Sequence, residues 1–281
     1  MSNSKVSGLQ DKAALIRIKT IKMLYDIGLE YKGHPGPALS IADILACLYF
    51  DVMKIFPEDP SRKDRDRFIL SKGHACPALY AALSLRGFFN ESHLGTFRHA
   101  GSILQGHPDM KKTPGIDMTA GSLGHGPGAG IGMALAAIID KLEYHTYVLV
   151  GDGELQEGLI WESVMAAGHF DLHNLTIIID RNRWQSCDAV DCTLDIEPLE
   201  KKFFSFGWNA VKIDGHNIEE ILAALGPEKN EEPTVVIANT IKGRGVSFME
   251  EDNSWHQRPI TEAEYKKAID ELEAGRKKWQ D

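Results

Sequence analysis

The chain has 281 residues, of which 43% are hydrophobic and 25% charged, so it can form one large α/β domain or two small ones. Its formal net charge of -9 argues against a nucleic-acid-binding protein, which would present a basic surface. The sequence shows no signal-peptide-like segment, no run of 18 apolar residues and no CxxC pairing among its four cysteines, so we expect a cytoplasmic protein without a membrane span, zinc site or disulfide framework.

The first half of the chain is predicted to be mostly helical. A helix is expected over residues 9–31, and a second follows a Gly/Pro-rich break at about 40–52. A short strand at 67–70 and a helix at 76–87 come next. Residues 90–128 are rich in Gly, His and Pro and are expected to be irregular, before a helix of small residues at 129–142.

The second half alternates between strands and helices. The predicted strands are 146–150, 175–180, 210–213 and 234–238, and the predicted helices are 154–168, 218–225 and 261–280. Within helix 154–168, the spacing of Trp161 and Met165 is typical of core residues. This alternation predicts a single α/β domain over residues 1–281, built on an open, mostly parallel sheet with helices on both faces.

Polar or glycine-rich segments follow all five predicted strands. They are residues 71–74, 151–154, 180–185, 214–217 and 239–245. In an open parallel sheet the carboxyl ends of the strands share one rim, where ligands bind. We therefore expect the five segments to meet around one site.

Two of these segments carry oxygen donors that suit a hard metal ion. Asp152 offers a carboxylate, Asn182 an amide oxygen and the backbone near Trp184 a carbonyl, which suits Mg²⁺ or Ca²⁺ better than zinc or iron. Gly153 is expected at the start of helix 154–168, where its N–H would face an anion. A metal beside a helix N-terminus predicts a diphosphate site.

Other nucleotide sites are less well supported. Residues 121–126, GSLGHG, are glycine-rich but follow no hydrophobic strand and lack the GxGxxG spacing of a nicotinamide dinucleotide site. The P-loop pattern GxxxxGK[ST] does not occur.

The GDG of residues 151–153, followed about thirty residues later by Asn182, resembles the thiamine diphosphate motif. Further segments resemble those of transketolases, in the same order and over nearly the whole chain. They are GHPGPALSIADILACLYF (33–50), DRDRFILSKGHACPALYAAL (64–83), GHPD (106–109), TAGSLGHGPGAGIGMA (119–134), DGHN (214–217) and TIKGRGVSFMEEDNSWH (240–256). The resemblance is to the first third of a transketolase, which binds the cofactor diphosphate.

This resemblance implies roles for particular residues. It places the metal on Asp152, Asn182 and the Trp184 carbonyl, and the diphosphate on Gly153. The remaining implied cofactor contacts are His74, Gly121, Leu123, Glu157, Asn182 and Lys242, with Lys72 nearby. The implied catalytic residues are His34, His74, His107 and His256, which line the donor-sugar channel, and Glu157, which connects to an activating glutamate across a subunit contact.

The implied reaction cleaves a ketose between C2 and C3 on the thiazolium carbanion of thiamine diphosphate, which acts as the electron sink. Histidines with near-neutral pKa values suit the proton transfers. His125 and His216 remain open between a functional and a purely structural role. Lys32, in place of a small residue, and Gln257-Arg258, in place of Gly-Lys, depart from the family pattern beside the channel.

The resemblance also implies a missing half. In transketolases the aminopyrimidine of the cofactor is bound by a second domain, which this chain does not encode, so we expect a carboxy-terminal partner chain, an α2β2 heterotetramer and an exposed apolar patch. The implied function is the amino-terminal subunit of a transketolase, transferring a two-carbon ketol unit from a ketose to an aldose and active only with its partner. The alternatives are a split transketolase for a branched or sulfonated sugar, the α subunit of a 2-oxoacid dehydrogenase, and a non-enzymatic cofactor-binding or regulatory protein without a partner.

Overall fold

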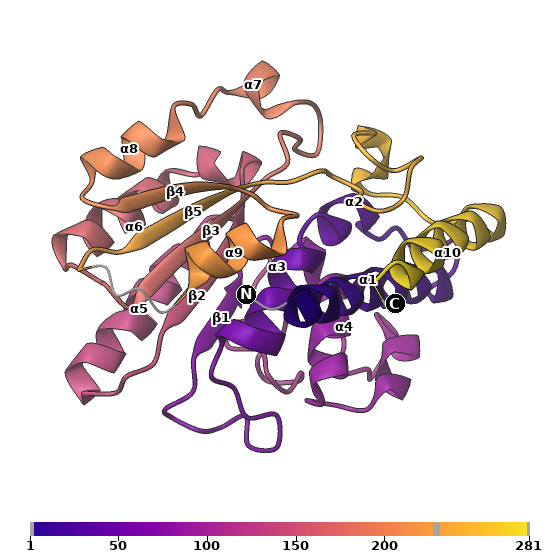
Figure 1. Ribbon diagram of the computed structural model, residues 1–281, viewed down its shortest axis with the longest axis horizontal. Helices are drawn as coiled ribbons and strands as arrows, with labels where there is room; N and C mark the ends of the chain where they lie inside the picture. The colour runs from indigo at the N-terminus through magenta and orange to yellow at the C-terminus, as the bar shows by residue number, and fades with distance from the viewer. Residues whose placement is uncertain (1–2, 227–230, 280–281) are drawn as a thin grey trace.

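The sheet at the centre of the protein has five strands, and all of their pairings are parallel. The computed structural model describes residues 3–226 and 231–279 (Figure 1). The strands are β1 (Arg67–Leu70), β2 (Thr146–Gly151), β3 (Leu175–Arg181), β4 (Asn209–Asp214) and β5 (Thr234–Asn239), in the spatial order β1-β2-β3-β5-β4. Since every strand runs in the same direction, all five carboxyl ends lie along one edge.

Strand side chains alternate between two hydrophobic cores, as a pleated sheet buried on both faces requires. In β2, Tyr147 and Leu149 enter the first core, whereas Val148 and Val150 enter the second. The run Leu175–Ile179 of β3, which is apolar except for Thr176, therefore reflects burial on both sides.

Helices cover both faces of the sheet (Figure 1). Packed around the first core are α1 (Asn3–Asp26), α2 (Pro35–Leu39), α3 (Ala42–Cys47), a π-helical turn (Leu48–Val52), α4 (Cys76–Arg86), α9 (Ile218–Leu225) and α10 (Glu262–Lys277). Packed around the second core are α5 (His125–Asp140), α6 (Gly158–His169) and α8 (Leu199–Ser205), with the short α7 (Val190–Thr193) nearby. Short 3₁₀ turns occupy Gly73–Ala75, Glu91–Thr96, Gly153–Gln156 and Asn253–His256.

The predicted fold class is confirmed, but several helix boundaries are wrong. The helix predicted at 9–31 starts at Asn3 and ends at Asp26, where the chain turns through Gly28 at φ 82°. The helix predicted at 40–52 is three shorter pieces from Pro35 onward, and the one predicted at 129–142 is α5, which starts at His125. The short helices α7 and α8 were not predicted.

The largest correction concerns the segment after β2. Residues 153–156 form a 3₁₀ turn and α6 begins only at Gly158, so Gly153 is not at the N-terminus of an α-helix. Met165, predicted to lie in the core, is 55% exposed. Trp161 is partly buried and does pack against the second core. At the other end, α10 spans Glu262–Lys277 rather than 261–280, with Thr261 forming a capping box with Glu264.

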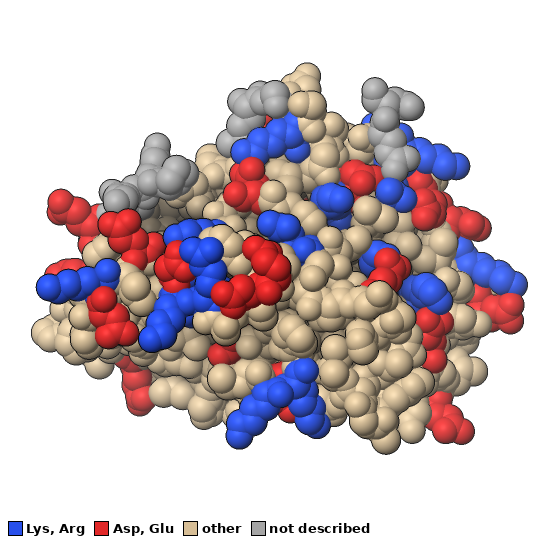
Figure 2. All heavy atoms as spheres, turned by 90° about the horizontal axis from the view of Figure 1, so that it is seen from below, with Lys and Arg blue, Asp and Glu red and all other residues tan. Residues whose placement is uncertain are grey.

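Residues Pro35–Val52 form a helical stretch long and apolar enough to cross a membrane, but 83% of this window is buried inside the domain, as in a core helix. On the face seen in Figure 2, acidic and basic side chains are interspersed, with no broad basic surface. This distribution agrees with the net charge of -9.

Candidate active site

The five strand-end segments meet at the carboxyl edge of the sheet, as predicted. Ser71, after β1, donates a hydrogen bond to Glu154, after β2. Other contacts cross between strands in the same way. The Asp180 side chain accepts hydrogen bonds from Lys72, after β1, and from Thr240, after β5. The side chain of Asp152 accepts one from the Arg183 N–H, and that of His216 accepts one from the Ile241 N–H. Residues far apart in sequence therefore form one connected polar site.

Asp152 is buried, 2% exposed, at the start of the turn after β2. Its Oδ1 accepts a hydrogen bond from the Gly153 N–H at 2.8 Å, and its Oδ2 accepts one from the Arg183 N–H at 2.5 Å. Burial, followed by the nearby charge of Asp180, raises the pKa of Asp152 to about 7. A carboxylate destabilised in this way gains most from a bound cation.

Gly153 has a packing role that differs from the predicted one. Its N–H is bonded to Asp152 rather than free at a helix end. A Cβ at this position would approach Gln185 Cβ to 2.8 Å, so a glycine is needed where the two segments pass each other. The Gly153 N–H would have to exchange its partner to contact a diphosphate.

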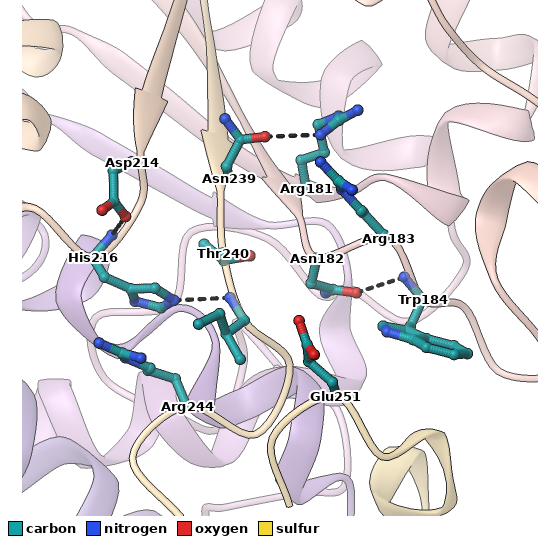
Figure 3. A pocket seen from close by; sticks show the side chains of 11 residues that line it. Arg181, Asn182, Arg183, Trp184, Asp214, His216, Asn239, Thr240, Arg244 and Glu251 are labelled. Carbon is teal, nitrogen blue, oxygen red and sulfur yellow. Dashed lines mark hydrogen bonds between the residues drawn. The ribbon is translucent and has the colours of Figure 1, made fainter.

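Asn182 presents its amide oxygen toward the same place. Its Nδ2 donates to Asp180 Oδ2 at 2.7 Å, which fixes the orientation of the amide, and its Oδ1 accepts a hydrogen bond from the Trp184 N–H at 3.0 Å (Figure 3). A second lone pair on Oδ1 remains for a metal. Within the part of the chain that is described, no hydrogen bond is donated to the Trp184 carbonyl, so its oxygen is also available.

These donors fit a hard cation. One buried carboxylate, one oriented amide oxygen and one main-chain carbonyl form an all-oxygen set, with positions left for phosphate and water. Over residues 3–226 and 231–279, no group of three or more His, Cys, Asp or Glu side chains could hold a metal. The candidate metal site is therefore the mixed oxygen set, in which Asp152 is the one acidic side chain.

Asp180 links the metal donors to the rest of the site, and sequence reasoning did not assign it a role. It is fully buried and accepts hydrogen bonds from Lys72 Nζ at 2.5 Å and Ser40 Oγ at 2.8 Å, besides Asn182 and Thr240. Although burial alone would raise its pKa, the charge of Lys72 keeps the pKa of Asp180 below its usual value. The signal was present in the sequence, since Asp180 is a charged residue that directly follows three isoleucines of a buried strand.

Three of the four predicted catalytic histidines form a ring cluster. His34, before α2, His74, after β1, and His256, in a late 3₁₀ turn, have ring centroids 5.0 to 5.5 Å apart. His107 is more exposed and packs against Gly121, where a Cβ would lie 3.2 Å from the imidazole ring. His107 also contributes to the lowered pKa values of His34 and His74, so it lies near the cluster.

The pKa values of these histidines differ from the near-neutral values expected. Burial, followed by neighbouring His107 and Arg98, lowers the pKa of His34 to about 4. Burial, followed by Lys242, lowers that of His256 to about 3. The pKa of His74 is also well below its usual value, because of burial and then Lys72. Without an anion in the site, the cluster is a set of neutral imidazoles beside two lysines.

Lys242 lies between the histidine cluster and the metal donors. It is 1% exposed, and its Nζ lies 2.9 Å from His256 Nδ1, 2.7 Å from Asn253 Oδ1 and 3.3 Å from the Gln185 carbonyl. Burial, followed by the charge of Lys72, lowers the pKa of Lys242 to about 8. Lys72 is paired with Asp180, whereas Lys242 forms no ion pair with a carboxylate of the described residues, so its buried ammonium group suits an anion such as a diphosphate.

The loop before α5 flanks the opposite side of the site. Gly121 has φ 143°, and Glu154 Oε1 accepts a hydrogen bond from the Gly124 N–H at 2.8 Å. The buried Glu154 thus fastens this loop to the turn after β2, a role that the sequence analysis missed. Leu123 is 38% exposed, as a residue that covers a cofactor ring would be.

Glu157, at the N-cap of α6, is exposed, and its carboxylate forms no hydrogen bond or ion pair with the described residues. It stands beside Gly124, where a Cβ would lie 2.8 Å from Glu157 Cβ. The role of Glu157 across a subunit contact stays a prediction.

A pocket of about 370 Å³ adjoins the metal donors at the ends of β3, β4 and β5 (Figure 3). Its lining residues are Arg181, Asn182, Arg183, Trp184, Asp214, His216, Asn239, Thr240, Ile241, Arg244 and Glu251. His216 lies at its base with both ring nitrogens bonded to protein groups, which leaves none for a substrate. His125 is exposed at the first position of α5, with Nδ1 3.2 Å from the Leu123 carbonyl.

Residues 11–278 match the family model of the transketolase, thiamine diphosphate binding domain. The chain belongs to the transketolase family. It is therefore the amino-terminal part of a transketolase, the part that binds thiamine diphosphate.

Transketolase relatives of two kinds are similar to this chain. Over 275 residues it is 44% identical to the 6-deoxy-6-sulfo-D-fructose transketolase subunit SqwG of Clostridium sp. (strain MSTE9), covering 97% of this chain and 98% of that protein. It is 41% identical to a subunit of the apulose-4-phosphate transketolase of Phocaeicola vulgatus, covering 90% of this chain and 91% of that protein. The transketolase of Homo sapiens is 40% identical over 95% of this chain, which spans 42% of the human protein.

The fold agrees with these similarities. The crystal structure of transketolase from Campylobacter jejuni superposes with a TM-score of 0.88 and 30% sequence identity, over 96% of this chain and 45% of that protein. The chain thus spans less than half of the single-chain transketolases and nearly all of the proteins named as subunits.

Proposed function

We propose that the protein is the amino-terminal subunit of a split transketolase, which transfers a two-carbon ketol unit from a ketose donor to an aldose acceptor. The observation that carries the proposal is a single rim holding both the oxygen donors of Asp152 and Asn182 and the histidine cluster of His34, His74 and His256. The family model and the relatives favour this function over the α subunit of a 2-oxoacid dehydrogenase.

In this proposal, Asp152, Asn182 and the Trp184 carbonyl would hold Mg²⁺ or Ca²⁺, and Gly153 and Lys242 would contact the diphosphate of the cofactor. When bound, thiamine diphosphate supplies the carbanion that attacks the donor carbonyl and stores the resulting electron pair. Gly121 and Leu123 cover the rings of the cofactor. The support is the burial and raised pKa of Asp152 and the two buried ammonium groups nearby.

The histidines would bind and orient the donor sugar. His34, His74, His107 and His256 present ring nitrogens to its hydroxyl groups and take part in proton transfer at the C3 hydroxyl and at the aldehyde formed. Their lowered pKa values fit neutral donors and acceptors of hydrogen bonds. An anionic cofactor next to them would raise these values toward neutrality.

A partner chain would complete the site. Glu157 is exposed and unpaired among the described residues, and α5 and α6 carry Ile139 at 76%, Met165 at 55% and Leu159 at 37% exposure. Large apolar side chains exposed on these two neighbouring helices fit a surface that binds a partner. We propose that this face binds a carboxy-terminal subunit carrying the pyrimidine-binding domain, in an α2β2 heterotetramer of the cytoplasm.

The donor is proposed to be an anionic sugar. Lys32 is exposed just before His34, and its carbonyl accepts a hydrogen bond from Arg98 Nη1 at 2.7 Å. Neither cation has an acidic partner within the described residues. Arg258 differs, because its Nη2 lies 2.7 Å from Glu264. Lys32 and Arg98 would favour a phosphorylated or sulfonated donor, which includes the pentose phosphates and the sugars named for the two subunit relatives.

A donor panel tests this proposal. The chain would be co-expressed with the product of the neighbouring gene, and ketol transfer measured with xylulose 5-phosphate, a sulfonated ketose, a branched ketose phosphate and a neutral ketose. The proposal predicts transfer from at least one anionic donor and much slower transfer from the neutral one. A complex that decarboxylates 2-oxoacids and transfers no ketol unit would contradict it.

A further inference from the structure

His216 is a half-buried histidine after β4 whose ring joins two other elements. Its Nδ1 lies 2.7 Å from Asp43 Oδ2, in α3, and its Nε2 accepts a hydrogen bond from the Ile241 N–H at 2.8 Å (Figure 3). A main-chain N–H can only donate, so the ring nitrogen facing it must carry a lone pair. The ring is therefore neutral, with its proton on Nδ1 directed to Asp43.

Asp43 is in turn held by Arg17 of α1. The two side chains form a bidentate pair, with Nη2–Oδ2 at 2.5 Å and Nη1–Oδ1 at 3.2 Å, and Arg17 Nε also donates to the Leu39 carbonyl at 3.3 Å. Although burial would raise the pKa of Asp43, Arg17 and the hydrogen bond from His216 hold it below its usual value. The acceptor for His216 is thus a buried carboxylate held in its ionised form by Arg17.

The loop after β5 is fixed on both sides of Lys242. Thr240 Oγ1 donates to Asp180, and the Ile241 N–H donates to His216. On the far side, the Gly243 N–H donates to the Gly36 carbonyl at 3.1 Å. Without His216, the Ile241 N–H would lose its only acceptor among the described residues.

Lys242 determines which ring nitrogen of His256 carries the proton. An ammonium group only donates, so His256 Nδ1, 2.9 Å from Lys242 Nζ, must be the acceptor. Neutral His256 then has its proton on Nε2. The centroid of its ring lies 5.5 Å from that of His34 and 5.4 Å from that of His74. A shift of the Lys242 backbone would weaken this contact and allow both tautomers.

We propose that His216 is a positioning residue of the donor-sugar site. Together with Asp43 it fixes the loop after β5, so that Lys242 imposes the Nε2–H tautomer on His256. The inference rests on the proposed function only in assigning His256 to the donor channel, because the tautomer itself is a property of the chain without cofactor or partner.

The test is nitrogen NMR of the 281-residue chain labelled with ¹⁵N-histidine, which distinguishes protonated from unprotonated ring nitrogens. The His256 signals are assigned by their loss in His256→Gln. The wild-type chain should show the Nε2–H form, and Lys242→Met should show a mixture. His216→Phe, which keeps the ring but lacks both nitrogens, should shift the His256 signals toward that mixture. If His216→Phe does not fold, as judged by circular dichroism, His216→Ala takes its place.

The matched control is His145→Phe. The His145 imidazole is also buried and hydrogen-bonded, 2.8 Å from Thr176 Oγ1, but it lies just before β2 at the opposite edge of the sheet. This variant should lose stability and keep the wild-type His256 signals.

In the assembled enzyme, His216→Phe should lower kcat/KM for the donor about 10-fold, as expected when a supporting hydrogen bond is lost.

Three results would overturn the proposal. They are unchanged His256 signals in His216→Phe, unchanged signals in Lys242→Met, and an equal change in His145→Phe, which would mean general destabilisation. An enzyme without ketol transfer, but with the expected NMR changes, would contradict the proposed function and leave the positioning role intact.

Discussion

The carboxylate of Asp152 accepts a hydrogen bond at 2.5 Å from the main-chain N–H of Arg183, which stands 31 residues later in the chain. This bond joins the turn after β2 to the turn after β3 and brings Asp152 beside Asn182. Arg183 adopts φ 67°, an uncommon value for a residue with a side chain. The two motifs are thus held as one unit at the rim of the sheet, before any ligand binds.

The first prediction concerns the metal site. The raised pKa of Asp152, about 7 against 3.8 when unfolded, means that the folded chain binds more protons than the unfolded chain between these pH values. Stability contributed by this group is therefore lost as pH rises through that window. Asp152→Asn should lack this pH dependence, so that the wild-type chain loses on the order of 1–4 kcal/mol of stability relative to the variant as pH rises from about 4 to 8 without metal, as measured by urea unfolding.

The same variant should no longer gain stability from Mg²⁺ and thiamine diphosphate, and Asn182→Ala should also fail to bind them in calorimetry. Asp191→Asn, which changes an exposed carboxylate in the same region, serves as the control and should behave like the wild-type chain. Undiminished binding of Mg²⁺ and thiamine diphosphate by Asp152→Asn would show that Asp152 is not a metal ligand.

The second prediction concerns the histidine cluster. Replacing His34, His74 or His256 by Ala should lower kcat/KM for the donor by about 10²-fold or more, because each removes a group that binds or transfers a proton. Cofactor affinity should change far less. His99→Ala, an exposed histidine outside the cluster, should have no effect. Normal donor turnover in all three cluster variants would show that these histidines are structural.

The third prediction concerns the partner-binding face. Ile139→Glu, at an exposed position of α5, should weaken assembly with the partner because it places a charge in an apolar interface. Phe204→Glu, on α8, is the matched control, since both side chains are 76% exposed. Analytical ultracentrifugation of the mixed subunits should show assembly with Phe204→Glu only. Equal assembly of both variants would place the interface elsewhere.

The fourth prediction concerns the charge of the donor. Lys32→Ser should raise KM for anionic donors several-fold, with little change for a neutral ketose, because the exposed ammonium attracts the charged group through solvent. Added salt should reduce the difference between the two enzymes. A KM that rises equally for charged and neutral donors would point to a steric role for Lys32 instead.

The sequence predicted the sheet and the rim because both follow from local patterns. Strands such as β2 (Thr146–Gly151) are followed by polar residues, and the parallel arrangement brings those ends together. The sequence could not show that Gly153 lies in a 3₁₀ turn, since a 3₁₀ turn and the first turn of an α-helix have the same local pattern. The exposure of Met165 could not be predicted either, because apolar residues have the same helical spacing whether they face a partner or pack on a core.

The network around Asp180 and the low pKa values of the histidines depend on long-range packing. Ser40 and Lys72, which bond to Asp180, lie 140 and 108 residues away in the chain. The pKa of His256 is lowered by burial and by Lys242, and neither effect can be read from its neighbours in the sequence. Identifying the residues was possible from the motifs, but their charge states required the fold.

The most direct test of the account is a ketol-transfer assay on the purified chain, on the purified partner and on their equimolar mixture. Each sample would contain Mg²⁺, thiamine diphosphate and an anionic ketose donor. We predict that neither polypeptide by itself transfers the two-carbon unit, because this chain would hold only the diphosphate end of the cofactor and the activating glutamate that Glu157 would contact is expected on the partner. The mixture should be active. Full activity of this chain alone, free of host transketolase, would contradict it.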